Sequence, residues 1–451
     1  MGSKLRKVKL GEILIFKTGK LDSNAADNNG EYPFFTCSPV TLSINSYAFD
    51  DEVVLLAGNN ANGVFSVKYY NGKFNAYQRT YVISPIDNTE ISVRWLYFRI
   101  KHVTSELQQM SVGTATKFLT KKILESYEIE LPSLQEQVFQ ADILWSFQEK
   151  ISNNETINQT LEQMAQALFK SWFIDFEPVK AKIAVLEAGG SQEEATLAAM
   201  TAISGKDADS LAIFEREYLE QYTELKATAE LFPSAMQGSE LGEIPVGWEV
   251  GKLGELIEFN PKRILKKGSI ASYLDMKNVP VIGHSAQDII DREFSSGSKF
   301  KNGDTLLARI TPCLENGKTA YVDFLPNDEA VGWGSTEFIV MRSNNNLPLS
   351  LSYFFARLDS FRTIAIQSMQ GTSGRQRADA SVLKNHIWVV PSKESLQKFG
   401  TFSDSILDGN RSRYAENKSL ADLRDTLLPK LLSGEITLPE AEQAVSEAEN
   451  V

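Results

Sequence analysis

The chain of 451 residues is poor in the side chains that most often build disulfide, metal and membrane sites. Its 2 cysteines, Cys37 and Cys313, lie far apart, so free thiols in a reducing compartment are expected. Its 3 histidines, His102, His284 and His386, lack metal-ligand spacing and are interpreted as structural. No apolar run has the length of a membrane span, and no signal peptide is recognisable. A cytoplasmic protein without a membrane partner is therefore predicted.

The sequence also lacks the motifs of common active sites. The stretch GKT at 317–319 ends like a phosphate-binding loop, but Pro312 stands where that motif requires glycine. Proline cannot donate a backbone N–H to a phosphate. The stretch NPK at 260–262 does not complete the signature of amino-methyltransferases, and Ser, His and Asp are too scattered to suggest a triad. We expect a binding protein with no catalytic residues, no cofactor site and no metal site.

Acidic residues are concentrated in two segments of the chain, whose formal net charge is −12. Residues 133–241 carry 7 Lys and Arg against 18 Asp and Glu, and residues 393–451 carry 7 against 11. Residues 1–132 and 242–392 are nearly balanced, at 15 against 13 and 17 against 16. The negative total therefore does not exclude a nucleic-acid partner for the balanced segments.

The two balanced segments are diverged copies of one plan. LGEILIF at Leu10 returns as LGELIEF at Leu253, and Gly-Thr at 113–114 returns as Gly-Thr at 371–372. Short alternating runs predict strands over Glu52–Leu56, Val64–Tyr70, Thr80–Ile83, Thr305–Ile310 and Glu337–Met341. Short helices are predicted over Val93–Ile100 and Leu351–Leu358. The predicted fold class is α+β, with two mixed β-rich globules in tandem, each followed by a long helix.

The two long helices, predicted over 133–176 and 393–432, share a seam with the three-and-four spacing of a coiled coil. The seam of the first helix comprises Phe147, Ile151, Asn154, Asn158, Leu161, Ala165, Leu168 and Trp172. The matching positions of the second helix are Ile406, Asn410, Asn417, Leu420, Leu427 and Leu431. Because the two seams correspond position by position, antiparallel pairing of the helices is favoured over separate burial of each.

These patterns divide the chain into successive parts: 1–132 and 241–392 as globules, 133–177 and 393–437 as the segments of the two long helices, 178–240 as a helical insertion and linker, and 438–451 as an acidic tail. The insertion carries a further heptad-like stripe of Leu211, Phe214, Tyr218, Tyr222, Leu225, Ala229 and Phe232. Proline at 178 is expected to stop the first helix.

Basic residues cluster in loop-like stretches that suit phosphate positioning and reading of base edges. The same Gly-Thr loop precedes the same helix in both copies, which favours a functional role over an ordinary solvated loop. The candidate DNA-binding residues are Thr114, Thr116, Lys117, Lys262, Arg263, Arg375 and Arg377.

Four stretches resemble the specificity subunits of type I restriction–modification systems. LEQMAQALFKSWFIDFEPV at Leu161 resembles the central conserved helix of that family, and LRDTLLPKLLSGEI at Leu423 resembles its C-terminal helix. LGEIPVGWEVGKLGEL at Leu241 is similar to the entry of the second target-recognition domain, and LPSLQEQ at Leu131 to the exit of the first. The first globule lacks the corresponding entry motif.

The resemblance implies a subunit without chemistry of its own, whose recognition domains each read one half of a bipartite target in double-stranded DNA. It implies that the paired helices dock two methyltransferase subunits and that restriction subunits join them. S-adenosylmethionine, ATP and Mg²⁺ would belong to those partners. Two alternatives stay open: a scaffold that binds protein or carbohydrate, and a specificity module of another methyltransferase-based defence system.

Overall fold

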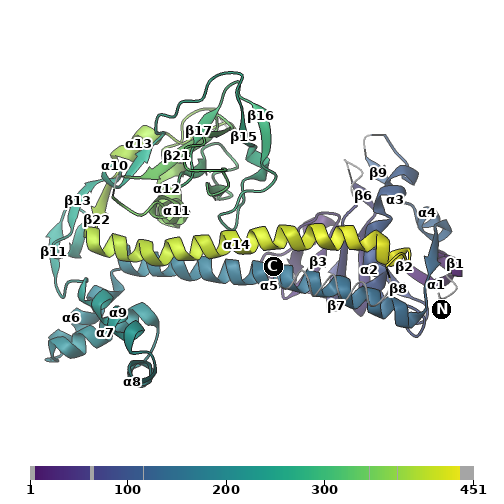
Figure 1. Ribbon diagram of the computed structural model, residues 1–451, viewed down its shortest axis with the longest axis horizontal. Coiled ribbons are helices and arrows are strands. Elements are labelled where there is room, and N and C mark those ends of the chain that lie inside the picture. The colour runs from purple at the N-terminus through teal and green to yellow at the C-terminus, as the bar shows by residue number, and fades with distance from the viewer. Residues whose placement is uncertain (1–5, 61–64, 115, 345, 373, 437–451) are drawn as a thin grey trace. The chain divides into compact units, whose positions relative to one another are not determined.

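The computed structural model describes residues 6–60, 65–114, 116–344, 346–372 and 374–436 (Figure 1). The acidic tail 438–451, the start of the predicted strand at Val64, and two loop positions, Ala115 and Ser373, lie outside the described residues. The chain falls into two units, one of residues 1–153 with 417–451 and one of residues 154–416. Each unit joins one globule to parts of both long helices.

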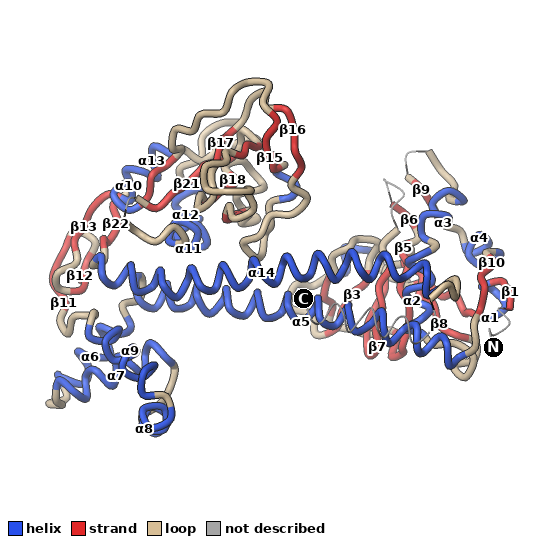
Figure 2. The backbone as a smooth tube through the Cα atoms, viewed as in Figure 1, coloured by secondary structure: helices blue, strands red, loops and turns tan. Residues whose placement is uncertain are grey.

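The first unit is built on a sheet in the order β2-β8-β5-β7-β3-β4 (Figure 2). Its strands are β1 Arg6–Lys9, β2 Leu14–Thr18, β3 Tyr32–Phe35, β4 Leu42–Ile44, β5 Phe49–Ala57, β6 Asn59–Asn60, β7 Val67–Ala76, β8 Thr80–Pro85, β9 Lys117–Phe118 and β10 Glu128–Leu131. Its short helices are α1 Leu10–Ile13, η1 Ser23–Ala25, α2 Val93–His102, α3 Thr104–Met110 and α4 Lys121–Ser126. The apolar side of α2, including buried Trp95, Leu96 and Phe98, joins the sheet in one core.

The second unit contains a sheet in the order β14-β21-β18-β19, which repeats the strands β2-β8-β5-β7 of the first unit. Neighbouring strands are antiparallel in both. A second sheet follows the order β16-β15-β20-β17. The strands are β11 Met236–Ser239, β12 Gly242–Pro245, β13 Glu249–Lys252, β14 Ile257–Phe259, β15 Ile270–Leu274, β16 Ile290–Glu293, β17 Ser298–Phe300, β18 Thr305–Ala308, β19 Thr319–Tyr321, β20 Gly332–Gly334, β21 Phe338–Ser343 and β22 Ile387–Val390. The helices of the globule are α10 Leu253–Leu256, η2 Met276–Asn278, α11 Leu351–Arg357, α12 Asp359–Gln367 and α13 Ala380–Asn385.

The two long helices are α5, Leu134–Phe173, and α14, Lys393–Leu432. In the first unit, the side chain of Gln140 donates to the carbonyl of Leu431 at 2.8 Å, and Asn417 donates to the carbonyl of Ile151 at 3.3 Å. Residue numbers rise along α5 as they fall along α14, so the helices pair antiparallel. The second unit continues this direction, with Asn154 donating to Glu416 at 2.7 Å. Among the described residues, no helix combines the length and apolar character needed to cross a membrane.

The helix predicted over 393–432 matches α14, whereas the helix predicted over 133–176 stops before its predicted end. α5 ends at Phe173, because the amides of Ile174 and Asp175 both turn back to the carbonyl of Lys170. The first helix does end before proline 178, and this proline itself stands in the first turn of α6, where its missing N–H costs nothing. α14 ends at Leu432, two residues before Gly434 at φ +72°.

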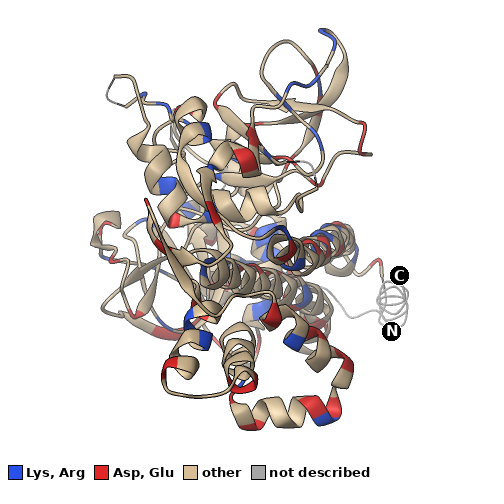
Figure 3. Ribbon diagram, turned by 90° about the vertical axis from the view of Figure 1, so that its left-hand side faces the viewer, with Lys and Arg blue, Asp and Glu red and all other residues tan. Residues whose placement is uncertain are grey.

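The insertion is helical, with α6 Glu177–Glu187, α7 Gln192–Ser204, α8 Ala208–Glu217 and α9 Leu219–Glu230. Its heptad-like stripe does not lie on one helix, because the backbone leaves the helical region at Tyr218, with φ −137° and ψ 57°. The segment described as a linker ends in β11, which pairs with β12 across the predicted boundary at 240. Figure 3 shows Asp and Glu spread along these helices, the lowest in that view.

Candidate nucleic-acid interface

The Gly-Thr loop of the first unit is closed by two backbone hydrogen bonds. The amide of Val112 donates to the carbonyl of Phe118 at 3.0 Å, and the amide of Phe118 donates back at 2.8 Å. Gly113 has φ +106°, and a Cβ there would lie 2.1 Å from the carbonyl oxygen of Thr116. This close approach restricts the position to glycine.

The second unit closes its Gly-Thr loop in the same way. The amide of Gln370 donates to the carbonyl of Arg377 at 3.0 Å, and the amide of Arg377 donates back at 2.9 Å. Gly371 follows the first of these residues, as Gly113 does in the first unit, and has φ +125°. Both loops are thus fixed at their base by the same pair of bonds and begin with a glycine in the left-handed region.

Each loop is also tied to the sheet and leads into a short helix. The amide of Leu119 donates to the carbonyl of Gly58 at 2.9 Å, and the amide of Ala378 donates to that of Arg309 at 2.8 Å. The next residue caps the helix that follows, Thr120 for α4 and Asp379 for α13. The backbone therefore fixes the two ends of each loop.

The loops expose different side chains. Thr114 is exposed, while Thr116 and Lys117 are half-buried, Lys117 because it lies in β9 and pairs with Asn60. In the second unit Arg375 and Arg377 are both exposed. A hydroxyl-rich loop and an arginine-rich loop with one backbone design can present different donors and acceptors to two ligand segments.

Arg377 is engaged by a carboxylate of its own unit. Its guanidinium meets Glu337 in a fork, with Nη2–Oε1 at 2.7 Å and Nε–Oε2 at 2.8 Å. The hydrogen bond from Arg377 holds the pKa of Glu337 below its usual range. The Arg377 side chain is 44% exposed and that of Glu337 22%, so an anionic ligand can reach the guanidinium from outside but must compete with Glu337 for it.

The basic stretch 262–267 has a mixed character. Lys262 is exposed. Arg263 donates to the fully buried carboxylate of Asp304 at 3.0 Å, and Arg342 donates to the same carboxylate at 2.6 Å. The placement of Arg263 is that of an internal anchor, whereas Lys262 is free to meet an outside ligand.

Comparison with known proteins identifies the family to which the two globules belong. The profile of the family described as "Type I restriction modification DNA specificity domain" matches residues 3–163 and 245–404, one match for each globule with part of its helix. The chain belongs to this family. The globules are its two recognition domains, and the fold is α+β, with the long helices pairing antiparallel.

Relatives support this membership over most of the chain. The specificity subunit of the HindI type I restriction enzyme from Haemophilus influenzae is 31% identical over 387 residues, covering 79% of this chain and 80% of that one. The EcoDI specificity subunit from Escherichia coli is 43% identical over 163 residues, but the match spans only 36% of this chain and 35% of that one. The S subunit of a type I restriction–modification system from M. genitalium shares the fold, with a TM-score of 0.51, 15% identity and coverage of 95% and 96%.

The structure of this specificity subunit places the seam residues of the long helices away from solvent. Those that are buried are Phe147, Ile151, Trp172, Ile406, Leu427 and Leu431, and those that are half-buried are Leu161, Leu168 and Leu420. Phe147, Leu427 and Leu431 lie in the core of the first unit. Trp172 and Ile406 lie in the core of the second.

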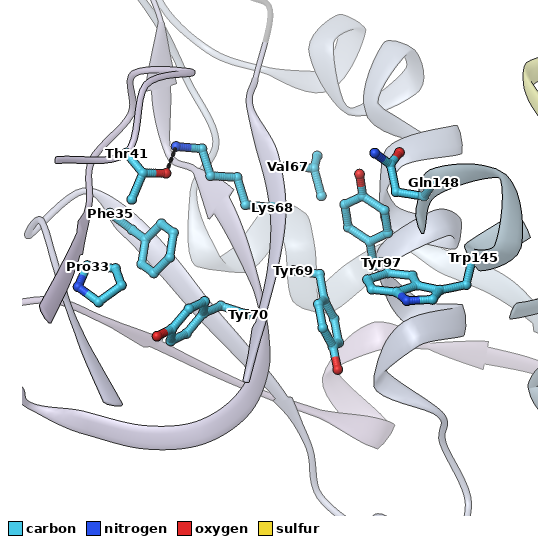
Figure 4. A pocket seen from close by; sticks show the side chains of 10 residues that line it. All are labelled: Pro33, Phe35, Thr41, Val67, Lys68, Tyr69, Tyr70, Tyr97, Trp145 and Gln148. Carbon is cyan, nitrogen blue, oxygen red and sulfur yellow. Dashed lines mark hydrogen bonds between the residues drawn. The ribbon is translucent and has the colours of Figure 1, made fainter. Parts of the chain in front are cut away.

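An aromatic cavity of about 420 Å³ lies in the first unit, between the sheet and α5 (Figure 4). Trp145 of α5 meets the ring of Tyr69 edge-on, with centroids 4.6 Å apart. Across the cavity, the amine of Lys68 donates to the hydroxyl of Thr41 at 3.0 Å, and burial lowers the pKa of Lys68. The cavity therefore marks the junction of the first recognition domain with its helix.

A buried ionic cluster around His284 was not identified from sequence. His284 Nε2 lies 3.2 Å from Asp323, and Nδ1 lies 3.7 Å from Glu162 of α5. Burial alone would lower the pKa of His284, but the two carboxylates raise it to about 9. The hydroxyl of Tyr353 also bonds to Glu162. The cluster ties the second recognition domain to α5 within the second unit, and no local spacing of residues signals it.

Proposed function

We propose that each recognition domain reads one half of a bipartite target in double-stranded DNA. The observation that carries this proposal is the loop closed by Val112–Phe118 in one domain and by Gln370–Arg377 in the other. The same backbone frame presents hydroxyls in the first domain and guanidinium groups in the second. Direct readout needs side chains held in fixed positions against base edges, and the duplicated loop supplies such positions for two different half-targets.

Within this proposal the candidate side chains have separate tasks. Arg375 is exposed, and no ion pair to it is found in the described part of the chain, so it is assigned to a base edge or a phosphate. Arg377 gives up its ion pair with Glu337 and binds DNA instead. Thr114 and Thr116 contact the first half-target, and Lys117 and Lys262 contact phosphates. Arg263 holds its loop from inside.

The long helices are proposed to dock two methyltransferase subunits, which restriction subunits join. The buried seam leaves the opposite helix faces for partners, and these faces include exposed Asp142, Glu149, Asp422 and Asp425 in the first unit. S-adenosylmethionine, ATP and Mg²⁺ are assigned to the partners, and this chain to a non-catalytic role in the cytoplasm.

Methylation mapping tests the central proposal. The chain is expressed with its methyltransferase subunit in a host free of competing methylation, and every methylated base is mapped. We expect one motif with two specified halves separated by an unspecified spacer. In the Arg375→Ala variant, we expect relaxed preference within one half, or a slope of log affinity against log salt reduced by about one.

Arg362→Ala is the matched control, because Arg362 lies on α12 and pairs with Asp359 outside the loop. It should leave both halves unchanged. A motif without two halves, or an Arg375→Ala variant with wild-type motif and salt slope, would refute the corresponding part of the proposal. DNA affinity that does not vary with salt would favour the alternative of a protein- or carbohydrate-binding scaffold.

A further inference from the structure

The loop between β14 and β15 presents an isoleucine to solvent. Ile264 is 93% exposed, more than any other large apolar side chain in the described part of the chain. Single exposed apolar residues are common on protein surfaces, so exposure alone assigns no role to Ile264. Its setting within the loop distinguishes it.

The residue before Ile264 is fixed to the body of the domain. Arg263 donates to the buried carboxylate of Asp304 at 3.0 Å, and the amine of Lys299 donates to the carbonyl of Arg263 at 3.3 Å. The ion pair is almost fully shielded, with 14% of the Arg263 side chain and none of the Asp304 side chain exposed. Ile264 therefore projects from an anchored backbone.

The far end of the same loop is fixed as well. The amide of Gly268 donates to the carbonyl of Phe294 at 2.9 Å, and the amide of Ser269 donates to that of Lys266 at 3.1 Å. Gly268 has φ +86°, which favours glycine at this turn. Ile264 thus stands near the middle of a loop held at both ends, so little ordering of the backbone is needed when a ligand binds.

Cations flank Ile264 on both sides. Lys262 precedes it, and Lys266 and Lys267 follow it, all three exposed. The stretch 260–269 contains no acidic residue, and within the described residues none of these lysines forms an ion pair. A fixed apolar tip between exposed lysines is complementary to a polyanion that carries an apolar group between its phosphates.

Double-stranded DNA offers such a group in the major groove. An isoleucine side chain can neither donate nor accept a hydrogen bond, so it cannot read the polar pattern of a base edge. The thymine C5-methyl is the apolar group that base edges display, and it lies in the major groove, which is about 12 Å wide. We propose that Ile264 contacts a thymine methyl in the half-target of the second recognition domain, while the flanking lysines contact phosphates. This inference rests on the proposed DNA-reading function.

The test compares wild type with Ile264→Ala on duplexes that carry the mapped motif. Each thymine of the second half is replaced singly by deoxyuridine, which removes only the methyl group. At one position we expect the replacement to lower the affinity of wild type about fourfold, the value for one buried methyl-sized group. The same replacement should leave the affinity of Ile264→Ala unchanged. Ile213→Ala, which removes the same atoms from an exposed site on α8, should respond like wild type.

The outcomes separate the two levels of inference. A mapped motif without two halves refutes the proposed function itself. A bipartite motif whose second half contains no thymine, or deoxyuridine substitutions that affect wild type and Ile264→Ala equally, refutes only the thymine contact. Lower affinity of Ile264→Ala on every duplex, with reduced DNA bending, would instead indicate a wedge between base pairs and would also overturn the proposal. Unchanged thermal unfolding of Ile264→Ala confirms that the variant is folded.

Discussion

Asn158 of α5 and Asn410 of α14 exchange hydrogen bonds across the helix seam. The side-chain amide of Asn410 donates to the backbone carbonyl of Asn158 at 3.2 Å, and the side-chain amide of Asn158 donates to the backbone carbonyl of Asn410 at 3.4 Å. Arg413 donates to both side-chain oxygens, at 2.5 Å and 2.7 Å. Both asparagines are almost fully buried. Polar pairs in a coiled-coil seam fix register at some cost in stability.

The pair predicts coupled effects of substitution. Asn158→Ala should lower the free energy of unfolding by roughly 1–3 kcal/mol, because Arg413 loses the side-chain oxygen to which it donates and the backbone carbonyl of Asn410 loses the donor across the seam. Asn158→Leu combined with Asn410→Leu should cost less than the two single changes together, because Arg413 is held by both side-chain oxygens and the first leucine already weakens its hold on the second. Denaturant unfolding of the four proteins of this double-mutant cycle measures the coupling. Additive effects would show that the two residues act independently.

Leu427 provides a test of the apolar part of the seam. It is 5% exposed in the core of the first unit. Leu427→Ala should cost roughly 2–5 kcal/mol, and Leu427→Asp more, because a charge would then be buried without a partner. Thermal unfolding measures both changes. Thr426→Asp is the control, since it places the same charge on the exposed face one residue away. Similar losses for Leu427→Asp and Thr426→Asp would contradict the assigned seam.

The periodic features of this chain were accessible from sequence because they are local. The three-and-four spacing identified the buried seam, and the run Thr80–Ile83 lies in β8, which extends to Pro85. The insertion shows where periodicity fails, since its stripe continues through Tyr218 although the helix ends at Glu217. Hydrophobic spacing reports which faces are apolar and does not register a break in the backbone between them.

The roles of charged residues were less accessible, because their partners lie far away in the sequence. In the sequence, Arg263 cannot be distinguished from the other basic residues of its loop. In the fold, it pairs with Asp304, which also binds Arg342. His284 likewise has a raised pKa because Glu162 and Asp323 lie beside it in the fold. Neither pairing leaves a local pattern. The sequence could therefore indicate which loops are basic, but not which cations remain available to DNA.

Two adjacent residues, Lys262 and Arg263, should accordingly respond in opposite ways. Arg263→Ala should lower the free energy of unfolding by roughly 1–3 kcal/mol, because Asp304 loses a charged hydrogen bond in a buried site. Lys262→Ala should leave stability within about 0.5 kcal/mol of wild type, as exposed substitutions usually do, and reduce the salt slope of DNA binding by about one. Chemical denaturation and salt titration of both variants decide this. A stable Arg263→Ala variant would remove its assignment as an anchor.

The ionic cluster of His284 predicts how stability depends on pH. Its pKa is raised to about 9 from an ordinary value of 6.5. The stabilisation is therefore fully present below about pH 6.5 and is lost as pH rises through about 9. Burial raises the pKa of Tyr414 to about 12 and raises that of Tyr353 well above its ordinary value, so these neighbours stay neutral in this window. Burial would raise the pKa of Glu162, but its bonds to His284 and Tyr353 lower it, so its contribution is lost only in acid.

Thermal unfolding between pH 6 and pH 10 measures this dependence. The second unit should lose on the order of 3 kcal/mol over the window, the value of a shift of that size in a buried group. His284→Gln should be less stable than wild type at pH 6, and its stability should change little up to pH 10, because glutamine carries no titrating charge. His386→Gln is the matched control, since His386 forms no ion pair within the described residues, and it should retain the wild-type pH profile. If His284→Gln instead keeps the full loss of stability between pH 6.5 and pH 9, the charge on His284 does not hold the second recognition domain to α5.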